Sequence, residues 1–266
     1  MNLCNLLKQC ETLVGLVRDG RRLRGCLQHP RNTFNSLRGR AFRRSRIRAY
    51  LASTAVRKLQ IGAGPHRLEG WLCSDIDPQL ESAVYLDARE RFPFGAGTFD
   101  YIYSEHMIEH ITWQEGRFML RECGRILKPG GTIRLTTPDL EVLAGLFRKD
   151  GTPVREQYIR WVTDTFLDGV NAYEPAFVIN NAFRRWGHQF LYDGDVLALA
   201  LQEAGFVNVR RCTPGESKDL NLRGVESHGK GWTADLATFE TMVFEGDRPA
   251  NALESAAPPK LTSPPA

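Results

Sequence analysis

The stretch Leu59-Gln60-Ile61-Gly62-Ala63-Gly64 is the part of this sequence that decides its fold. Residues of strand character run into a pair of glycines, and the missing Cβ atoms let a ligand approach the backbone closely. An ordinary turn after a strand has the same pattern. The stretch indicates a ligand site because Asp75 and Asp87 follow at the ends of the next two expected strands. The first carboxylate suits a ribose diol and the second an adenine amino group, although either aspartate alone also fits a solvated loop.

Outward from this stretch, short β-rich segments alternate with helical segments. We expect strands at residues 58–61, 71–76, 83–86, 98–103, 132–136, 206–211 and 239–245. We expect helices at residues 105–111, 113–127 and 193–205. Thr112 and Glu115 form the sequence signature of a capping box before the second of these helices. Strands separated by helices predict a parallel sheet covered by helices, with ligands bound beyond the carboxyl ends of the strands.

Length and composition fit a folded globular protein. The chain has 266 residues, of which 42% are hydrophobic and 25% charged. No apolar run approaches the roughly 18 residues of a membrane-spanning helix, and the first residues lack the pattern of a secretory signal. The six cysteines include no Cys-x-x-Cys pair, so neither a zinc ribbon nor a disulfide framework is indicated. We therefore expect a cytoplasmic protein with reduced thiols.

The charge of the chain is unevenly distributed. Residues 1–60 hold 14 Lys or Arg against two acidic residues, a net charge of +12, which leaves −8 for the remainder. We expect residues 1–57 to form a basic helical extension, with an amphipathic helix over residues 3–17 and another near 41–52. One interpretation packs this extension on the main domain with its arginines in solvent. The other makes it a surface for nucleic acid or for anionic lipid, which would hold the protein peripherally at the inner membrane face.

Several segments, in this order, resemble class I S-adenosylmethionine-dependent methyltransferases. They are Ile61-Gly62-Ala63-Gly64, Asp75-Ile76-Asp77-Pro78, Asp87-Ala88, Thr98-Phe99-Asp100-Tyr101-Ile102 and Leu127-Lys128-Pro129-Gly130-Gly131-Thr132. Gly70-Trp71-Leu72, the run from Ser104 to His110 and the run from Asn180 to Tyr192 resemble a bacterial subgroup often found near surface-polysaccharide genes.

The resemblance implies an α/β, Rossmann-like methyltransferase fold. Its sheet would have seven mostly parallel strands with the last antiparallel, helices on both faces, and the N-terminal helical extension added. The implied domain spans residues 58–246, and the Pro- and Ala-rich residues 247–266 are expected to form a disordered tail. The resemblance also implies S-adenosylmethionine as cofactor, bound by Gly62, Ala63, Gly64, Asp75, Asp87, Ala88 and Ser104.

The spacing departs from the common pattern at one point. Gly62 and Asp75 are only 13 residues apart, and Pro65 stands where a phosphate-binding helix would begin. The usual first helix must be short or absent, which argues against a nicotinamide dehydrogenase. It leaves open whether Asp75 or Asp77 meets the ribose; we favour Asp75 because it lies nearer the strand end.

Methyl transfer to a hydroxyl needs an aligned nucleophile and a group that removes its proton. Histidine suits that task near neutral pH, and we take His106, His110 and His188 as candidate catalytic residues. The run from His106 to His110 also matches the H-x-x-E-H motif of inverted zinc proteases. The surrounding cofactor pattern leaves no room for a protease architecture, so we expect no metal. In the alternative interpretation, His106 or His110 only caps or packs a helix.

A long insertion at residues 140–192 is predicted to form a lid. Amides, arginines, aromatics and a histidine are dense near its end, which suggests recognition of a polar or sugar-like acceptor. The candidate substrate-binding residues are Glu105, Asn181, Arg184, Trp186, Tyr192 and His228. The lid's aromatics alternatively only cover the edge of the sheet.

Three functions follow from these patterns. The first is O-methylation of a glycan or another polar metabolite. The second is an RNA methyltransferase whose basic arm binds phosphates, although the chain lacks an Asn-Pro-Pro-Tyr or cysteine-nucleophile signature, so nucleic acid is the less favoured partner. The third is a non-catalytic module that binds the cofactor and docks on a membrane or protein partner.

Overall fold

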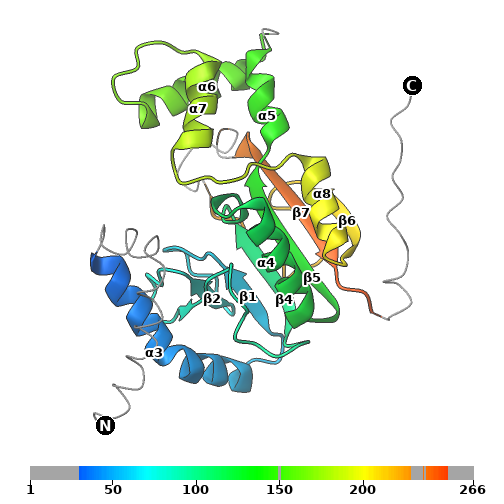
Figure 1. Cartoon of the computed structure of the whole chain (residues 1–266). Helices are drawn as coiled ribbons and strands as arrows, with labels where there is room; N and C mark the ends of the chain where they lie inside the picture. Colours follow the sequence, from blue (N-terminus) through cyan, green and yellow to red (C-terminus); the bar gives the residue numbers. More distant parts are fainter. Residues whose placement is uncertain (1–29, 149–150, 229–235, 237, 251–266) are drawn as a thin grey trace.

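The seven strands in the described part of the chain form one sheet. The computed structural model describes residues 30–148, 151–228, 236 and 238–250. The strand order is β3-β2-β1-β4-β5-β7-β6, with β7 antiparallel to both neighbours and the pairs among β1 to β5 all parallel (Figure 1). The strands are β1 Lys58–Ile61, β2 Leu72–Asp75, β3 Val84–Tyr85, β4 Phe99–Glu105, β5 Leu127–Pro138, β6 Val207–Cys212 and β7 Thr241–Asp247. The predicted Rossmann-like methyltransferase fold is confirmed.

Helices α4 (Trp113–Ile126) and α8 (Gly194–Glu203) start as their sequences predict. The Thr112 hydroxyl accepts a hydrogen bond from the Glu115 N–H, and the Glu115 carboxylate accepts one from the Thr112 N–H at 2.9 Å. This reciprocal pair satisfies two backbone donors that α4 leaves free. Asp193 caps α8 by accepting from the Val196 N–H at 2.8 Å. Both helices contribute to the main hydrophobic core of the sheet.

The other face of β4 is covered differently. Tyr103 is fully buried there and packs with Trp71 and with Leu222 and Val225, which come from the connection between β6 and β7. Residues 213–228 of that connection contain no helix. This long segment therefore reaches back across the sheet, and its far end lies at the carboxyl end of β4.

Helix α3 (Pro30–Ser53) packs against β3 and contains the predicted helix at residues 41–52. Gly39 permits this approach, because a Cβ there would lie 2.7 Å from the side chain of Pro78. Arg46 donates to the Ala83 carbonyl at 2.8 Å, whereas Arg44 and Arg48 are exposed. For this helix the packed arrangement is confirmed. The predicted helix over residues 3–17 lies outside the described residues.

The insertion between β5 and α8 is helical and has its own core. It comprises α5 (Leu140–Ala144), η2 (Gly145–Phe147), α6 (Pro153–Phe166) and α7 (Pro175–Arg184), grouped at one end of the sheet in Figure 1. Their buried apolar residues, together with Leu191, form a hydrophobic cluster separate from that of the sheet. We call this helical insertion the lid. None of the helices in the described part of the chain is long and apolar enough to cross a membrane.

The predicted helix at residues 105–111 is wrong. β4 continues to Glu105, His106 adopts a left-handed conformation with φ 44°, and only a 3-10 turn, η1 (Ile108–His110), follows. The reason is tertiary, since the His106 N–H donates to the Thr136 carbonyl at 3.0 Å and extends the pairing with β5. Pairing along the sheet outweighs the helical pattern of this short segment.

The start of the predicted tail is also wrong. β7 runs to Asp247, and the Arg248 guanidinium donates to the backbone carbonyls of Arg125 and Leu127. These contacts cap the carboxyl end of α4. The ordered part of the chain therefore includes residues 247–250, and residues 251–266 lie outside the described range.

Candidate active site

The glycine loop after β1 is joined to the end of β2 by one carboxylate. Asp75 accepts hydrogen bonds from the N–H groups of Gly64 and Asp77, both at 2.8 Å. Gly62 and Gly64 have φ values of +72° and +51°, a region that favours glycine. Burial raises the pKa of Asp75 above its ordinary value, although the two backbone donors oppose that shift. Asp75, rather than Asp77, is therefore the carboxylate fixed beside the glycine loop.

The connection between β1 and β2 lacks a helix, as the short spacing predicts. Residues 62–71, all described, form turns and irregular backbone. A Cβ on Gly62 would lie 2.5 Å from the Cγ of Met107, whereas nothing lies within 4 Å of the equivalent position on Gly64. Ala63 is buried and packs with Cys73 and Ala83, so its side chain faces the protein interior. The open side of the loop is at Gly64.

Two further predicted cofactor residues lie after β3. Asp87 is buried and is held by Arg89 through two hydrogen bonds of 2.8 Å. Ala88 is buried in the main core. Ser104, near the end of β4, has a buried hydroxyl with no hydrogen-bond partner among the described residues. The carboxylates and glycines fit an adenosyl cofactor, because the loop leaves room at Gly64 and Asp75 is preset by two backbone donors.

Four of the six histidines gather beyond the carboxyl ends of β4 and β5. His106 lies with its Nδ1 3.3 Å from Glu109 Oε1, and its ring stacks on that of His228 with centroids 3.8 Å apart. Burial opposes charge on His106, but the contact with Glu109 outweighs it and raises the pKa of this histidine. The same contact holds the pKa of Glu109 below its ordinary value against the effect of burial. Burial, reinforced by His106, lowers the pKa of His228 to about 4.

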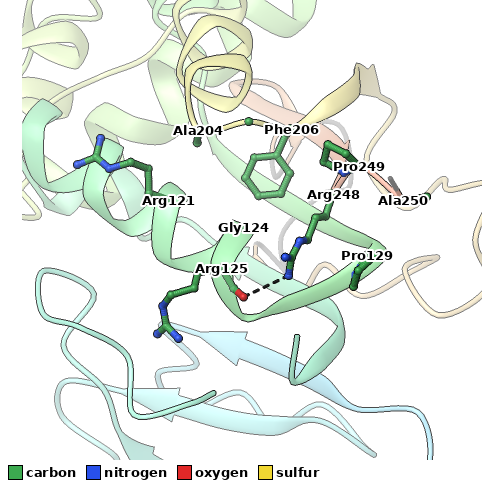
Figure 2. A pocket seen from close by; sticks show the side chains of 10 residues that line it. Arg121, Gly124, Arg125, Pro129, Ala204, Phe206, Arg248, Pro249 and Ala250 are labelled. Carbon is green, nitrogen blue, oxygen red and sulfur yellow. Dashed lines mark hydrogen bonds between the residues drawn. The ribbon is translucent and has the colours of Figure 1, made fainter. Parts of the chain in front are cut away.

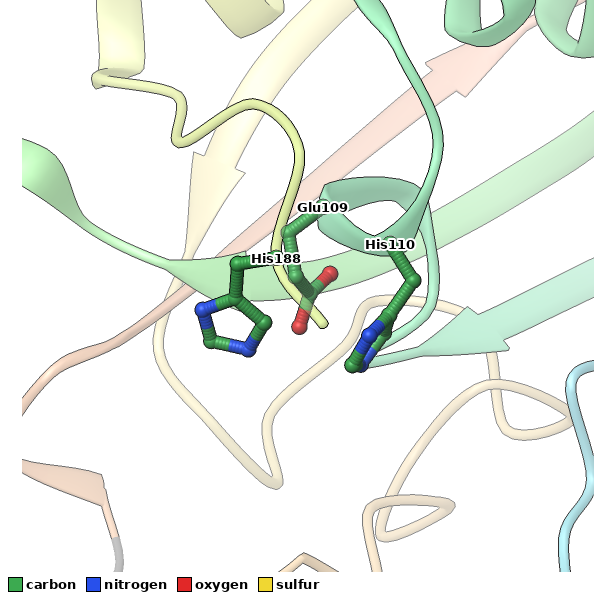
Figure 3. A group of neighbouring side chains, drawn as sticks. All are labelled: Glu109, His110 and His188. Atoms are coloured by element: carbon green, nitrogen blue, oxygen red, sulfur yellow. The ribbon is translucent and has the colours of Figure 1, made fainter. Parts of the chain in front are cut away.

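The remaining two histidines flank the same glutamate. Figure 3 shows Glu109 between His110 and His188, whose rings lie 4.9 Å apart at 74°. His188 Nδ1 is 2.7 Å from the Ala182 carbonyl, which accepts hydrogen bonds only. Nδ1 therefore carries the proton and Nε2 has the free lone pair. Burial lowers the pKa of His188, so the ring is neutral near pH 7.

Two left-handed residues set this arrangement. His106 and Trp186 have φ values of 44° and 60°, which are unusual for residues with side chains. His106 lies three residues before Glu109 in the chain, and Trp186 lies two residues before His188. Such conformations persist where surrounding contacts fix them, and they concentrate at functional sites.

Glu105 contacts the end of the connection between β6 and β7. Its carboxylate accepts hydrogen bonds from the Ser227 N–H at 2.7 Å, the Ser227 hydroxyl at 2.6 Å and the His228 N–H at 2.8 Å. These three hydrogen bonds lie within the protein, and the predicted contact of Glu105 with a substrate stays a prediction. The carboxylate positions His228 over His106.

The other predicted substrate residues divide into two groups. Arg184 and Trp186 are exposed, and the Trp186 ring lies 5.7 Å from that of His188. Tyr192 and Asn181 are buried, and their predicted contact with an acceptor stays a prediction. Tyr192 packs against Trp113 in the core of the sheet. The Tyr192 hydroxyl and the Asn181 amide have no hydrogen-bond partner in the described part of the chain.

Sequence reasoning missed Glu109 as a central residue. Glu109 lies inside the H-x-x-E-H run, whose two histidines are the predicted catalytic residues. The structure turns His106 toward His228 and Thr241, while His110 faces His188. An acidic residue directly before His110 was the available signal.

A pocket of about 430 Å³ lies away from this cluster. It is lined by arginines and apolar residues at the amino end of β5, including Arg121, Arg248 and Phe206 (Figure 2). Gly62, Asp75 and the histidines lie at the carboxyl ends of their strands, at the opposite end of the sheet. This pocket is thus separate from the candidate active site.

Comparisons with known proteins agree with the fold. Residues 73–135 match the family described as a methyltransferase domain. An S-adenosylmethionine-dependent methyltransferase from Mesorhizobium loti is 14% identical, with 76% of this chain and 95% of the other covered and a TM-score of 0.45. A SAM-dependent methyltransferase from Archaeoglobus fulgidus is 15% identical, with 86% of this chain and 100% of the other covered and a TM-score of 0.43. No curated protein matches the chain.

A third similar structure contains the methyl donor. It is a phosphoethanolamine N-methyltransferase from Haemonchus contortus in complex with S-adenosyl-L-methionine, 16% identical, with 74% of this chain and 49% of the other covered and a TM-score of 0.41. These TM-scores, all below 0.5, mark distant likeness. Residues 73–135 are thus similar to a methyltransferase domain, and they lie within a sheet of strand order β3-β2-β1-β4-β5-β7-β6.

Proposed function

We propose that the protein transfers a methyl group to a hydroxyl of a glycan or another polar metabolite. The observation that carries this proposal is the pair His110 and His188, placed between the sheet and the exposed Trp186. A hydroxyl must lose its proton as it is methylated, and a neutral imidazole with a free lone pair suits that task.

The donor side is formed by the loops after β1, β2 and β3. When bound, S-adenosylmethionine supplies a methyl group on a positively charged sulfur, open to in-line displacement. Asp75 would accept hydrogen bonds from the ribose hydroxyls, and Asp87, whose carboxylate Arg89 holds in place, would accept one from the adenine amino group. Gly62, Gly64 and Ser104 would line the methionine end, where close backbone approach is possible.

The acceptor side is formed by the cluster and the lid. His188 is neutral near pH 7 with Nε2 unprotonated, so it can take the proton of a hydroxyl directly. Glu109 lies beside it and stabilises the imidazolium that results. Glu105 and His228 close this side by holding the end of the β6–β7 connection against β4.

The lid surface supports a sugar-like acceptor. Its exposed aromatic side chains are Phe147, Tyr173, Phe177, Phe183 and Trp186. Aromatic faces offer apolar contact to the C–H faces of a sugar ring, while Arg184 offers donors to hydroxyl or anionic groups. The nearest of these to the cluster is Trp186.

The test is methyl transfer from labelled S-adenosylmethionine to a panel of acceptors. Oligosaccharides are compared with amines and with RNA, using wild type, His110→Gln, His188→Gln and the exposed His66→Gln as control. We expect labelled oligosaccharide from wild type and the control, with rates at least about 100-fold lower in the other two variants. Labelling of amines or RNA alone, or undiminished turnover in both variants, contradicts the proposal.

A further inference from the structure

We propose that Glu109, His110 and His188 bind a divalent first-row transition metal ion that holds the acceptor hydroxyl. The binding stands on geometry alone, while the role toward the acceptor rests on the proposed function. The two histidines then act on the acceptor through the ion instead of taking its proton themselves. This revises the expectation, drawn from the sequence, that the protein uses no metal.

The three donor atoms lie close enough to share one ion. One atom from each side chain lies within 4.8 Å of the other two. An ion placed centrally among three such atoms would lie no more than about 2.8 Å from each of them. Metal–ligand bonds to nitrogen and oxygen are about 2.0–2.2 Å long. Each side chain must therefore move inward by about 0.7 Å or less, which small rotations of its torsions provide.

The protein holds these ligands in place before any ion arrives. The Glu109 carbonyl accepts hydrogen bonds from the N–H groups of Gln189 and Phe190, at 2.7 and 3.2 Å, so the segment that carries His188 is tied to η1. The Ala182 carbonyl orients the His188 ring and leaves Nε2 unprotonated. Metal-bound histidines are commonly oriented in this way by a carbonyl on the second nitrogen.

The carboxylate has its own supporting contacts. Thr137 donates to Glu109 Oε2 at 3.1 Å, and His106 Nδ1 lies 3.3 Å from Oε1. Glu109 is fully buried, and Oε1 has no hydrogen-bond partner in the described residues beyond this ion pair. Beside the contact with His106, Oε1 therefore keeps acceptor capacity that a metal ion could use.

The donor set selects the class of ion. Two imidazoles and one carboxylate suit zinc, iron, cobalt or nickel, whereas magnesium and calcium prefer oxygen ligands throughout. Three protein ligands also leave coordination positions open, as catalytic sites do. A metal site of this composition differs from the zinc-protease motif, because His106 faces Thr241 and His228 and is not one of the three proposed ligands.

The open positions lie between donor and acceptor sides. Met107, three residues before His110, packs directly against Gly62 of the cofactor loop. On the other side, Trp186 lies against His188 and belongs to the end of the lid. A hydroxyl held by the ion would lose its proton to solvent more readily than a free one. Its oxygen would then bond to the methyl carbon as the carbon–sulfur bond breaks toward sulfur.

The first experiment measures binding without donor or acceptor. Tag-free full-length protein, treated with EDTA, is titrated with Co²⁺ while visible absorption and heat are recorded. We expect one bound ion with d–d bands and no thiolate charge-transfer band, displaced by Zn²⁺. Glu109→Gln, His110→Gln and His188→Gln should each weaken binding at least about 10- to 100-fold, and His66→Gln should not.

Circular dichroism shows which variants fold. If Glu109→Gln, at a buried position, does not fold, His188→Gln on the lid is the variant that tests the site. Absence of a bound ion in wild type overturns the proposal, as does binding that His110→Gln and His188→Gln leave unchanged. The second experiment repeats methyl transfer with chelated and Co²⁺-loaded wild type. Undiminished turnover after chelation overturns the role of the ion. No turnover with any acceptor, loaded or chelated, counts against the proposed function, and the titration still decides whether the site exists.

Discussion

The rings of His106 and His228 stack face to face, with centroids 3.8 Å apart and planes inclined by 18°. The two histidines have opposite environments. His106 contacts Glu109 through its ring, whereas the backbone N–H of His228 donates to the Glu105 carboxylate. Glu109 raises the pKa of His106, whereas burial and the neighbouring His106 lower the pKa of His228, because two positive rings at this separation repel each other.

This relationship predicts how His228 titrates. Its pKa is lowered from 6.5 to about 4 by burial first and by His106 second, with Glu105 and Glu109 opposing and His66 adding slightly. Between these two values the unfolded chain binds a proton and the folded chain does not. The free energy of unfolding contributed by His228 therefore falls as pH falls from 6.5 to about 4. Proton–nitrogen correlation NMR of the imidazoles should show His228 neutral at pH 5, and a pKa near 6.5 contradicts this prediction.

Asp75→Asn should weaken S-adenosylmethionine binding. The amide keeps the shape of the side chain but loses one acceptor, and the bonds lost to a charged group correspond to about 10- to 100-fold in affinity. Calorimetry measures the dissociation constant, with Asp77→Asn as the matched control that should bind as wild type. Equal weakening of binding in both variants would contradict the prediction that Asp75 is the residue that binds the ribose. Because the pKa of Asp75 is raised, affinity in wild type should also begin to fall at a higher pH than for an ordinary aspartate.

Gly62→Ala and Gly64→Ala separate backbone strain from crowding. Both residues have positive φ, which costs a residue with a Cβ about 1–2 kcal/mol. Only the Cβ at position 62 meets a neighbour, Met107 Cγ at 2.5 Å, so this variant should lose a further 1–3 kcal/mol or so. Denaturant unfolding measures both. Adding Met107→Ala to Gly62→Ala should recover part of the loss if crowding is the cause.

Glu105→Gln should loosen the end of the β6–β7 connection. The carboxylate accepts three hydrogen bonds from Ser227 and His228, and an amide replaces one acceptor oxygen with a donor that faces N–H groups. We expect a loss of about 1.5–3 kcal/mol in stability and faster amide exchange at residues 215–228. Glu216→Gln, on the exposed part of the same connection, is the control. Unchanged exchange in Glu105→Gln would show that the carboxylate does not hold this segment.

Local signals in the sequence predicted most of the scaffold. Thr112 with Glu115, and Asp193 before α8, are caps formed within four residues of each other, so sequence spacing alone reveals them. The short distance from Gly62 to Asp75 correctly predicted a connection without a helix. These features depend on neighbours in the chain, which a sequence shows directly.

The site was predicted less completely because its contacts are long-range. Glu105 meets residues more than 120 positions away, and nothing near it in the sequence indicates that its carboxylate is already used. Tyr192 and Asn181 looked suited to an acceptor by residue type, but packing buries both. The opposite directions of His106 and His110 follow from pairing between β4 and β5, which overrode a helical pattern that would have placed them together.

The separate hydrophobic core of the lid has a consequence for how this enzyme can diversify. Trp186 and His188 follow directly after helices stabilised by their own cluster, while Gly62, Asp75 and Asp87 belong to the sheet. Under the proposed function, changes in the lid core can therefore alter acceptor choice without disturbing Gly62, Asp75 and Asp87, the residues proposed to hold the methyl donor. Residues 140–191 are therefore the segment to exchange between relatives when acceptor specificity is to be changed and the sheet with its donor loops is to be kept.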